Sequence, residues 1–144
     1  SGPALRAGAA AKPDLLRINS AELGELADKP LSGHTEIIAA MRAIISEGIP
    51  MIAVSFGEQG VLGMDESGCW QVQTPAVAVQ SQTGAGDVMA AGLLVKLALG
   101  FPFTESLRFA AALTTASVLC AQPGDYDDAA LPQILEATQL TKIG

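Results

Sequence analysis

The sequence has 144 residues, 49% of them hydrophobic, and its net charge of −7 results from 8 basic and 15 acidic residues. A chain of this length and apolar content is expected to form a single domain, residues 1–144, with a packed core. No cluster of Lys or Arg is long enough to follow a nucleic-acid backbone, so no nucleic acid is expected as a partner.

The pattern of apolar residues predicts neither secretion nor membrane insertion. Residues 1–12 are rich in Ala and Gly and show no continuous apolar core after a basic leader. The longest apolar stretches, residues 88–99 and 109–121, are too short to span a bilayer. Cys69 and Cys120 lack the spacing of a zinc site or a disulfide framework. We therefore expect no membrane partner and a location in the reducing cytoplasm.

Helical and strand patterns alternate along the first half of the chain. The expected elements are a helix at 3–11, a strand at 15–18, helices at 19–27 and 35–47, and strands at 51–55, 60–64 and 69–73. Between the last two strands, residues 65–68 (DESG) have the composition of a hairpin turn.

The second half of the chain is predicted to be mainly helical. Residues 77–79 are expected to form a strand that leads into a glycine-rich turn, and helices are expected at about 85–99, 104–120 and 129–140. Strands that alternate with helices indicate an α/β fold with a largely parallel sheet, to which an antiparallel hairpin is attached.

The glycine turn, residues 84–87 (GAGD), is the strongest functional feature of the sequence. Such a turn lets the backbone approach a ligand, and the helix start behind it favours phosphate. A carboxylate beside an anion site repels the anion unless it has a chemical task, so Asp87 indicates phosphoryl transfer to a hydroxyl group. The alternative is capping alone, because an Asp in the first turn also meets the helix dipole favourably.

Three segments resemble the ribokinase-like sugar kinases, and among them the branch of 1-phosphofructokinases and tagatose-6-phosphate kinases. The segments are residues 12–26 (KPDLLRINSAELGEL), 55–60 (SFGEQG) and 83–94 (TGAGDVMAAGLL). The resemblance implies a three-layer sandwich, of which this chain is the carboxyl-terminal half, with the amino-terminal substrate half and the lid absent. The mean hydropathy of +0.37 fits apolar surface that the absent half would cover.

The resemblance also implies an activity, which is ATP-dependent phosphoryl transfer to a sugar phosphate such as fructose 1-phosphate or tagatose 6-phosphate. Asp87 would be the catalytic base, and Gly84, Ala85 and Gly86 would form the anion hole. Nucleotide contacts would come from residues in three loops: Ser55, Gly57, Gly60, Thr83 and Gly124. The full-length protein would suit a homodimer, whereas the isolated half is expected to be weakly active or inactive.

Asn19 and Glu22 would organise Mg²⁺ through water if the resemblance holds. The same Asn-x-x-Glu spacing is that of a capping box, and both roles can hold at once. Arg17 and Ile18 stand where the family usually has Lys and Pro, which leaves the shape of this loop open. Gln82 stands where Ser or Thr is usual, which weakens any inference of a monovalent-cation site and leaves the use of such a cation open.

Several simpler interpretations remain open. Residues 55–60 also suit an ordinary strand-to-hairpin turn, and Gly124 also suits a helix stop. His34 is expected to be a solvated loop residue rather than a base. The whole chain could be a non-catalytic nucleotide-binding or assembly module from a truncated relative, or part of a kinase for an unphosphorylated sugar or a nucleoside.

Overall fold

The computed structural model describes residues 2–56, 60–122 and 125–144, and the chain divides into two compact units. The first unit comprises residues 1–70 and 142–144, and the second comprises residues 71–141. Five strands form a mixed sheet in the order β1-β2-β3-β4-β5. Within the described ranges, no helix has both the length and the apolar character needed to cross a bilayer.

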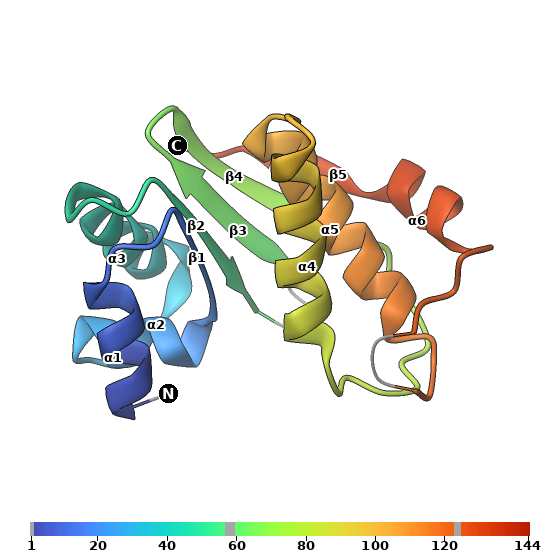
Figure 1. Cartoon of the computed structure of the whole chain (residues 1–144), viewed down its shortest axis with the longest axis horizontal. Coiled ribbons are helices and arrows are strands. Elements are labelled where there is room, and N and C mark those ends of the chain that lie inside the picture. The colour runs from blue at the N-terminus through green and yellow to red at the C-terminus, as the bar shows by residue number, and fades with distance from the viewer. Residues whose placement is uncertain (1, 57–59, 123–124) are drawn as a thin grey trace. The chain divides into compact units, whose positions relative to one another are not determined.

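The first unit follows the predicted alternation of helices and strands (Figure 1). Its elements are α1 (Gly2–Ala10), β1 (Leu15–Asn19), α2 (Ser20–Ala27), α3 (Gly33–Ser46), β2 (Met51–Ser55), β3 (Val61–Asp65) and the start of β4 (Gly68–Gln73). Strands β1 and β2 are parallel, and β2 and β3 are antiparallel. The expected elements of this half, including the hairpin, are therefore confirmed.

Apolar side chains on alternate strand positions form the core of the first unit. In register, they make two rows across β1, β2 and β3: Leu16–Ile52–Met64 and Ile18–Val54–Leu62. Alternate residues of a strand point to the same face, so both rows share one face. Helices α2 and α3 cover it with buried Leu23, Ile37, Met41 and Ile44. Each buried side chain of this size contributes about 1.5–3 kcal/mol.

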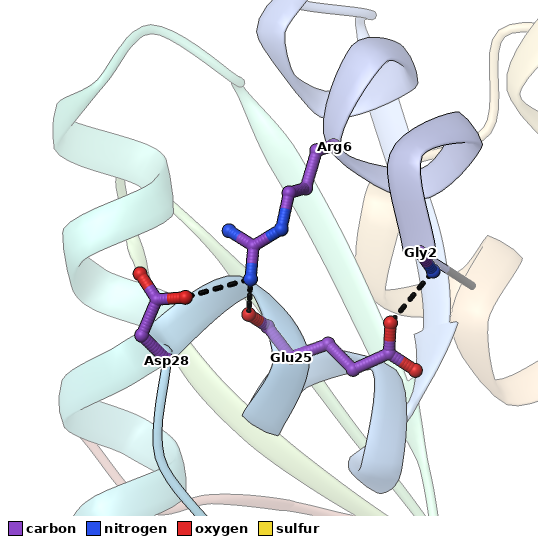
Figure 2. Close-up of polar contacts among 4 residues, drawn as sticks. All are labelled: Gly2, Arg6, Glu25 and Asp28. Atoms are coloured by element: carbon purple, nitrogen blue, oxygen red, sulfur yellow. Dashed lines mark hydrogen bonds and ion pairs between the residues drawn. The ribbon is translucent and has the colours of Figure 1, made fainter.

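Helix α1 is attached to α2 by polar contacts, which Figure 2 shows. The Arg6 guanidinium donates to the carbonyl oxygen of Glu25 and to the carboxylate of Asp28, both at 2.6 Å. The Gly2 N–H donates to the Glu25 carboxylate at 2.7 Å. The Arg6–Asp28 ion pair is well exposed, with relative exposures of 50% and 75%, and such pairs add about 0–1 kcal/mol. Its main effect is therefore to orient α1.

Helices dominate the second unit. Its elements are the rest of β4, then α4 (Ala85–Ala98), α5 (Phe103–Ser117), α6 (Leu131–Ala137) and most of β5 (Gln139–Lys142). Helix α4 packs against α5, and α5 packs against α6 (Figure 1). The predicted helices at about 85–99 and 104–120 are confirmed in existence and approximate extent.

The strand expected at residues 77–79 is absent from the structure, so that prediction is wrong. Pro75 has no N–H to donate to a ladder, and Val79 is 43% exposed. The chain then runs to Gln80, whose N–H donates to the carbonyl of Val118, the residue directly after α5, rather than to a strand. The segment is held by a helix end and not by a sheet.

The helix expected at residues 129–140 is shorter than predicted, and β5 follows it. The chain leaves helical geometry at Thr138, which has φ −78° and ψ 124°. Arg108 on α5 donates to the carbonyls of Leu135 and Thr138, so it satisfies acceptors that a longer helix would have used. Arg108 therefore acts as a side-chain cap for the end of α6.

Gly92 lies where α4 meets α5. A Cβ atom on Gly92 would lie 3.1 Å from Ala110 Cα and 3.2 Å from Ala110 Cβ, which is tighter than ordinary van der Waals contact. The neighbouring atoms belong to the backbone and the first side-chain carbon of α5, so they cannot rotate away. The absence of a side chain at Gly92 sets the distance between the two helices.

We expect Gly92→Ala to lower the free energy of unfolding by about 1 kcal/mol, because α5 must move to admit the methyl group. The matched control is Gly8→Ala in α1, where no atom lies within 4 Å of the added Cβ. That variant should gain about 0.5–1 kcal/mol from helix propensity. Urea unfolding followed by circular dichroism measures both, and equal stabilisation of the two variants would contradict the packing argument.

Candidate active site

In the first unit, the structure brings three of the predicted site residues to one edge of the sheet. Asn19 and Ser55 are the last residues of the parallel strands β1 and β2, and they are register partners. Glu22 lies in the first turn of α2, directly after β1. The carboxyl ends of parallel strands are the edge at which open α/β sheets bind ligands.

Asn19 and Glu22 form the capping box that their spacing predicts. The Glu22 N–H donates to Asn19 Oδ1 at 2.8 Å, and the Asn19 N–H donates to the Glu22 carboxylate at 3.1 Å. The capping role is therefore confirmed. It accounts for both residues without any metal.

The same pair was also assigned to Mg²⁺, and the geometry limits how it could serve. No group of three or more His, Cys, Asp or Glu side chains that could hold a metal occurs among the residues that the structure describes. An oxygen that accepts one N–H keeps a second lone pair, with which it can still accept from water. Asn19 and Glu22 therefore fit a water-mediated role, which stays a prediction, better than direct ligation.

The turn after β2 is closed by the backbone. The Phe56 N–H donates to the carbonyl of Gly60 at 3.0 Å, and Gly60 is buried with φ +95°, which favours glycine. Ser55 is half-buried at the start of this turn. Gly57 and Gly124, which were assigned to the nucleotide, lie outside the described residues.

His34 was expected in a loop, but it lies in the first turn of α3. Its ring is exposed, and its centroid lies 6.0 Å from that of Phe56, next to the end of β2. The structure gives it a ring neighbour but no hydrogen-bonded partner among the described residues that would make it a base.

In the second unit, the glycine turn has a defined backbone geometry. The Ala85 N–H donates to the carbonyl of Gln82 at 3.1 Å, and Gly84 has φ 81° and ψ 0°. These angles are those of the third residue of a type II turn, a position that requires glycine or asparagine. The Val88 N–H then donates to the carbonyl of Gly84 at 3.0 Å and begins α4.

This geometry changes which amides can face an anion. The Ala85 N–H is already engaged in the turn, although it was predicted to belong to the anion hole. Gly86 and Asp87 follow at the second and third positions of α4, where no helix carbonyl can accept their N–H groups. The anion hole stays a prediction, with Gly86 and Asp87 as its available donors.

Asp87 is exposed in the first turn of α4. Its carboxylate makes no hydrogen bond or ion pair within the part of the chain that the structure describes. In α2, by contrast, Glu22 occupies the same third position and bonds back to the residue before the helix. The carboxylate of Asp87 is therefore available to accept a proton from a bound hydroxyl group.

Sequence reasoning missed the residues that hold this turn in place. The Thr83 N–H donates to the hydroxyl oxygen of Ser81 at 3.2 Å, and the N–H groups of Gln80 and Ser81 both donate to the carbonyl of Val118. A serine two residues before the bonded N–H is typical of a serine turn, so Ser81 could have been recognised. The Val118 acceptor is a main-chain group and leaves no mark in the sequence.

We expect Asn19→Ala to lower the free energy of unfolding by about 1 kcal/mol without nucleotide or magnesium, because the Glu22 N–H loses its side-chain acceptor, while the bond donated by the backbone N–H of residue 19 can persist. Ser32→Ala is the matched control. Ser32 precedes α3 but makes no side-chain capping bond, so its loss should cost much less. Urea unfolding compares the two, and an unchanged Asn19→Ala variant would leave the residue without a capping role in solution.

Comparison with known proteins identifies the family of the chain. Residues 2–130 match the pfkB family carbohydrate kinases. The 1-phosphofructokinase of Haemophilus influenzae is 39% identical over 99% of this chain and 46% of its own length. The chain thus spans less than half the length of this relative.

Solved structures show the same fold. Phosphofructokinase-2 from Escherichia coli, crystallised with substrates and products, is 33% identical and has a TM-score of 0.87 over 94% of this chain and 45% of that one. Ribokinase from Arabidopsis thaliana, crystallised with ribose and ATP, is 28% identical with a TM-score of 0.76 over 85% of this chain and 41% of that one. The predicted ribokinase-like α/β fold is confirmed, and the chain belongs to the pfkB family of carbohydrate kinases.

Proposed function

We propose that this chain carries the nucleotide-binding and catalytic half of an ATP-dependent kinase that phosphorylates a hydroxyl group of a sugar phosphate. The observation that carries the proposal is the unpaired, exposed carboxylate of Asp87 in the first turn of α4, directly after the glycine turn. The likeness to a 1-phosphofructokinase favours fructose 1-phosphate as the acceptor, which would yield fructose 1,6-bisphosphate. Tagatose 6-phosphate is the second candidate substrate.

In the proposed reaction, Asp87 acts as the general base. The acceptor hydroxyl donates to the carboxylate, and its proton passes to Asp87 as the oxygen forms a bond to the γ-phosphorus of ATP. The bond from that phosphorus to the bridging oxygen breaks, and ADP leaves with the electron pair. The N–H groups of Gly86 and Asp87, at the positive end of α4, would stabilise the negative charge on the phosphoryl group in transit.

Other predicted residues would bind the nucleotide and its metal. Ser55, Gly60 and Thr83 are assigned to the nucleotide, in agreement with the resemblance of their loops to those of sugar kinases. Magnesium, when bound with ATP, neutralises phosphate charge. Asn19 and Glu22 would hold water molecules of that ion while they continue to cap α2.

A second candidate is a module that binds nucleotide without turnover. The observation that favours it is the capping box, which accounts for Asn19 and Glu22 without a metal. The two candidates differ in what Asp87 does. A base is needed for turnover and not for binding, whereas a carboxylate near an anion opposes binding in either case.

We expect Asp87→Asn to lower kcat by about 10²- to 10⁴-fold, because the amide cannot accept the proton. Binding of magnesium and the non-hydrolysable analogue AMP-PNP should be unchanged or tighter, since a negative charge near the anion is removed. Turnover is measured with fructose 1-phosphate, tagatose 6-phosphate and fructose 6-phosphate, in the 144-residue chain and in any longer natural polypeptide that contains it. Binding is measured by calorimetry.

The matched control is Asp128→Asn, the same change at an exposed position before α6, which should leave kcat unaltered. Retained turnover in Asp87→Asn would remove this residue from the mechanism. Nucleotide binding without turnover in every wild-type polypeptide tested would favour the binding module.

A further inference from the structure

The segment that leads into the glycine turn is tied to the end of α5. The N–H groups of Gln80 and Ser81 donate to the carbonyl of Val118, at 2.7 and 3.3 Å. Val118 is the residue that ends α5, and its own N–H donates to Thr114 in the last turn of that helix. The chain therefore enters the turn from a fixed point on a packed helix.

Ser81 also makes a hydrogen bond to the turn itself. Its hydroxyl oxygen accepts the N–H of Thr83 at 3.2 Å, which bends the chain between the two residues. Thr83 is the second residue of the type II turn, and Gly84 is the third. The Ser81 hydroxyl thus fixes the position of Thr83, the residue directly before the left-handed Gly84.

We propose that Ser81 is a positioning residue for phosphoryl transfer. Its hydroxyl holds the Thr83 N–H, and this bond sets the direction in which the Gly86 and Asp87 N–H groups and the Asp87 carboxylate leave the turn. Ser81 itself need not touch a substrate. The proposal rests on the proposed kinase function and adds a residue that the motif assignment did not include.

Loss of the bond between Ser81 and Thr83 should affect the stability of the fold and the positioning of the catalytic groups to different extents. The bond between Ser81 and Thr83 is exposed, so water can replace the hydroxyl as the partner of the Thr83 N–H, and the fold should survive its loss. Catalysis is less tolerant, because a displacement of about 1 Å can cost about 100-fold in rate. Loss of the hydroxyl should therefore act on kcat far more than on folding.

The experiment compares Ser81→Ala, Ser81→Thr and the matched control Ser46→Ala. Ser46→Ala also removes one exposed local hydrogen bond of a serine hydroxyl, here one that the hydroxyl donates to the carbonyl of Ala43 at 2.7 Å at the end of α3. Amide hydrogen exchange at Thr83 reports the bond directly in the 144-residue chain. Steady-state kinetics in the active polypeptide report kcat and KM, and thermal unfolding reports stability.

In Ser81→Ala, we expect loss of protection at Thr83 and a fall in kcat of about 10-fold, with KM for the sugar phosphate nearly unchanged. Ser81→Thr keeps the hydroxyl and should restore both protection and kcat to within about 3-fold of the wild type. Ser46→Ala should match the wild type in kcat. A Ser81→Ala variant with normal kcat, or a Ser81→Thr variant as slow as Ser81→Ala, would overturn the proposal and leave the kinase function standing.

The kinase function fails only if no wild-type polypeptide tested, neither the 144-residue chain nor a longer one, turns over a sugar phosphate, and nucleotide binding then decides the role of Ser81. Weaker binding of magnesium and AMP-PNP in Ser81→Ala, restored in Ser81→Thr, would support Ser81 as the residue that shapes the anion site. Equal binding in all variants, or no binding by the wild type, would overturn it.

Discussion

The left-handed conformation of Gly84 is the constraint on which the candidate catalytic segment depends. With φ 81° this residue lets the chain reverse in one turn and begin α4 at Ala85. A side chain there would be strained by about 1–2 kcal/mol, which is large for a turn that few other bonds secure. The position of Asp87 follows directly, because it is three residues beyond Gly84 and thus in the first turn of the helix. The positions of the Asp87 carboxylate and of the available N–H groups therefore depend on the backbone conformation of Gly84.

In the first unit, strand register determines where the predicted polar residues lie. Leu16 and Ile18 face the core, and Asn19, which directly follows Ile18, ends the strand next to Ser55. A slip by one residue would turn the apolar row to the opposite face, at a cost of several buried side chains. Burial thus fixes the strand ends, and the strand ends fix where the predicted polar residues lie. The placement of Asn19 and Ser55 at this edge is therefore a consequence of the core.

The elements that could be predicted are those whose physical cause lies in neighbouring residues. Short apolar segments predicted β1 and β2, and the Asn19–Glu22 spacing predicted a capping box, because each depends on local composition or on a bond across three residues. The segment 77–79 looked like a strand by composition, but a strand also needs a partner, and that is a tertiary property. The bonds to Val118 and the cap from Arg108 were unpredictable for the same reason, since their acceptors are main-chain carbonyls distant in sequence.

Helices α2 and α4 both carry a carboxylate at their third residue, and comparing the two distinguishes a capping carboxylate from one available for chemistry. In α2 the third residue is Glu22, which reaches back to the N–H of Asn19, so its carboxylate stabilises the helix start. In α4 the third residue is Asp87, whose side chain is shorter by one methylene group and makes no such bond. The dipole of α4 still favours the charge by about 0.3–1 kcal/mol, but that effect would be as large for a carboxylate used only as a cap. Among the described residues, the Asp87 carboxylate has no hydrogen-bond partner, and the phosphoryl transfer proposed above requires a group in this state to accept the proton of the hydroxyl.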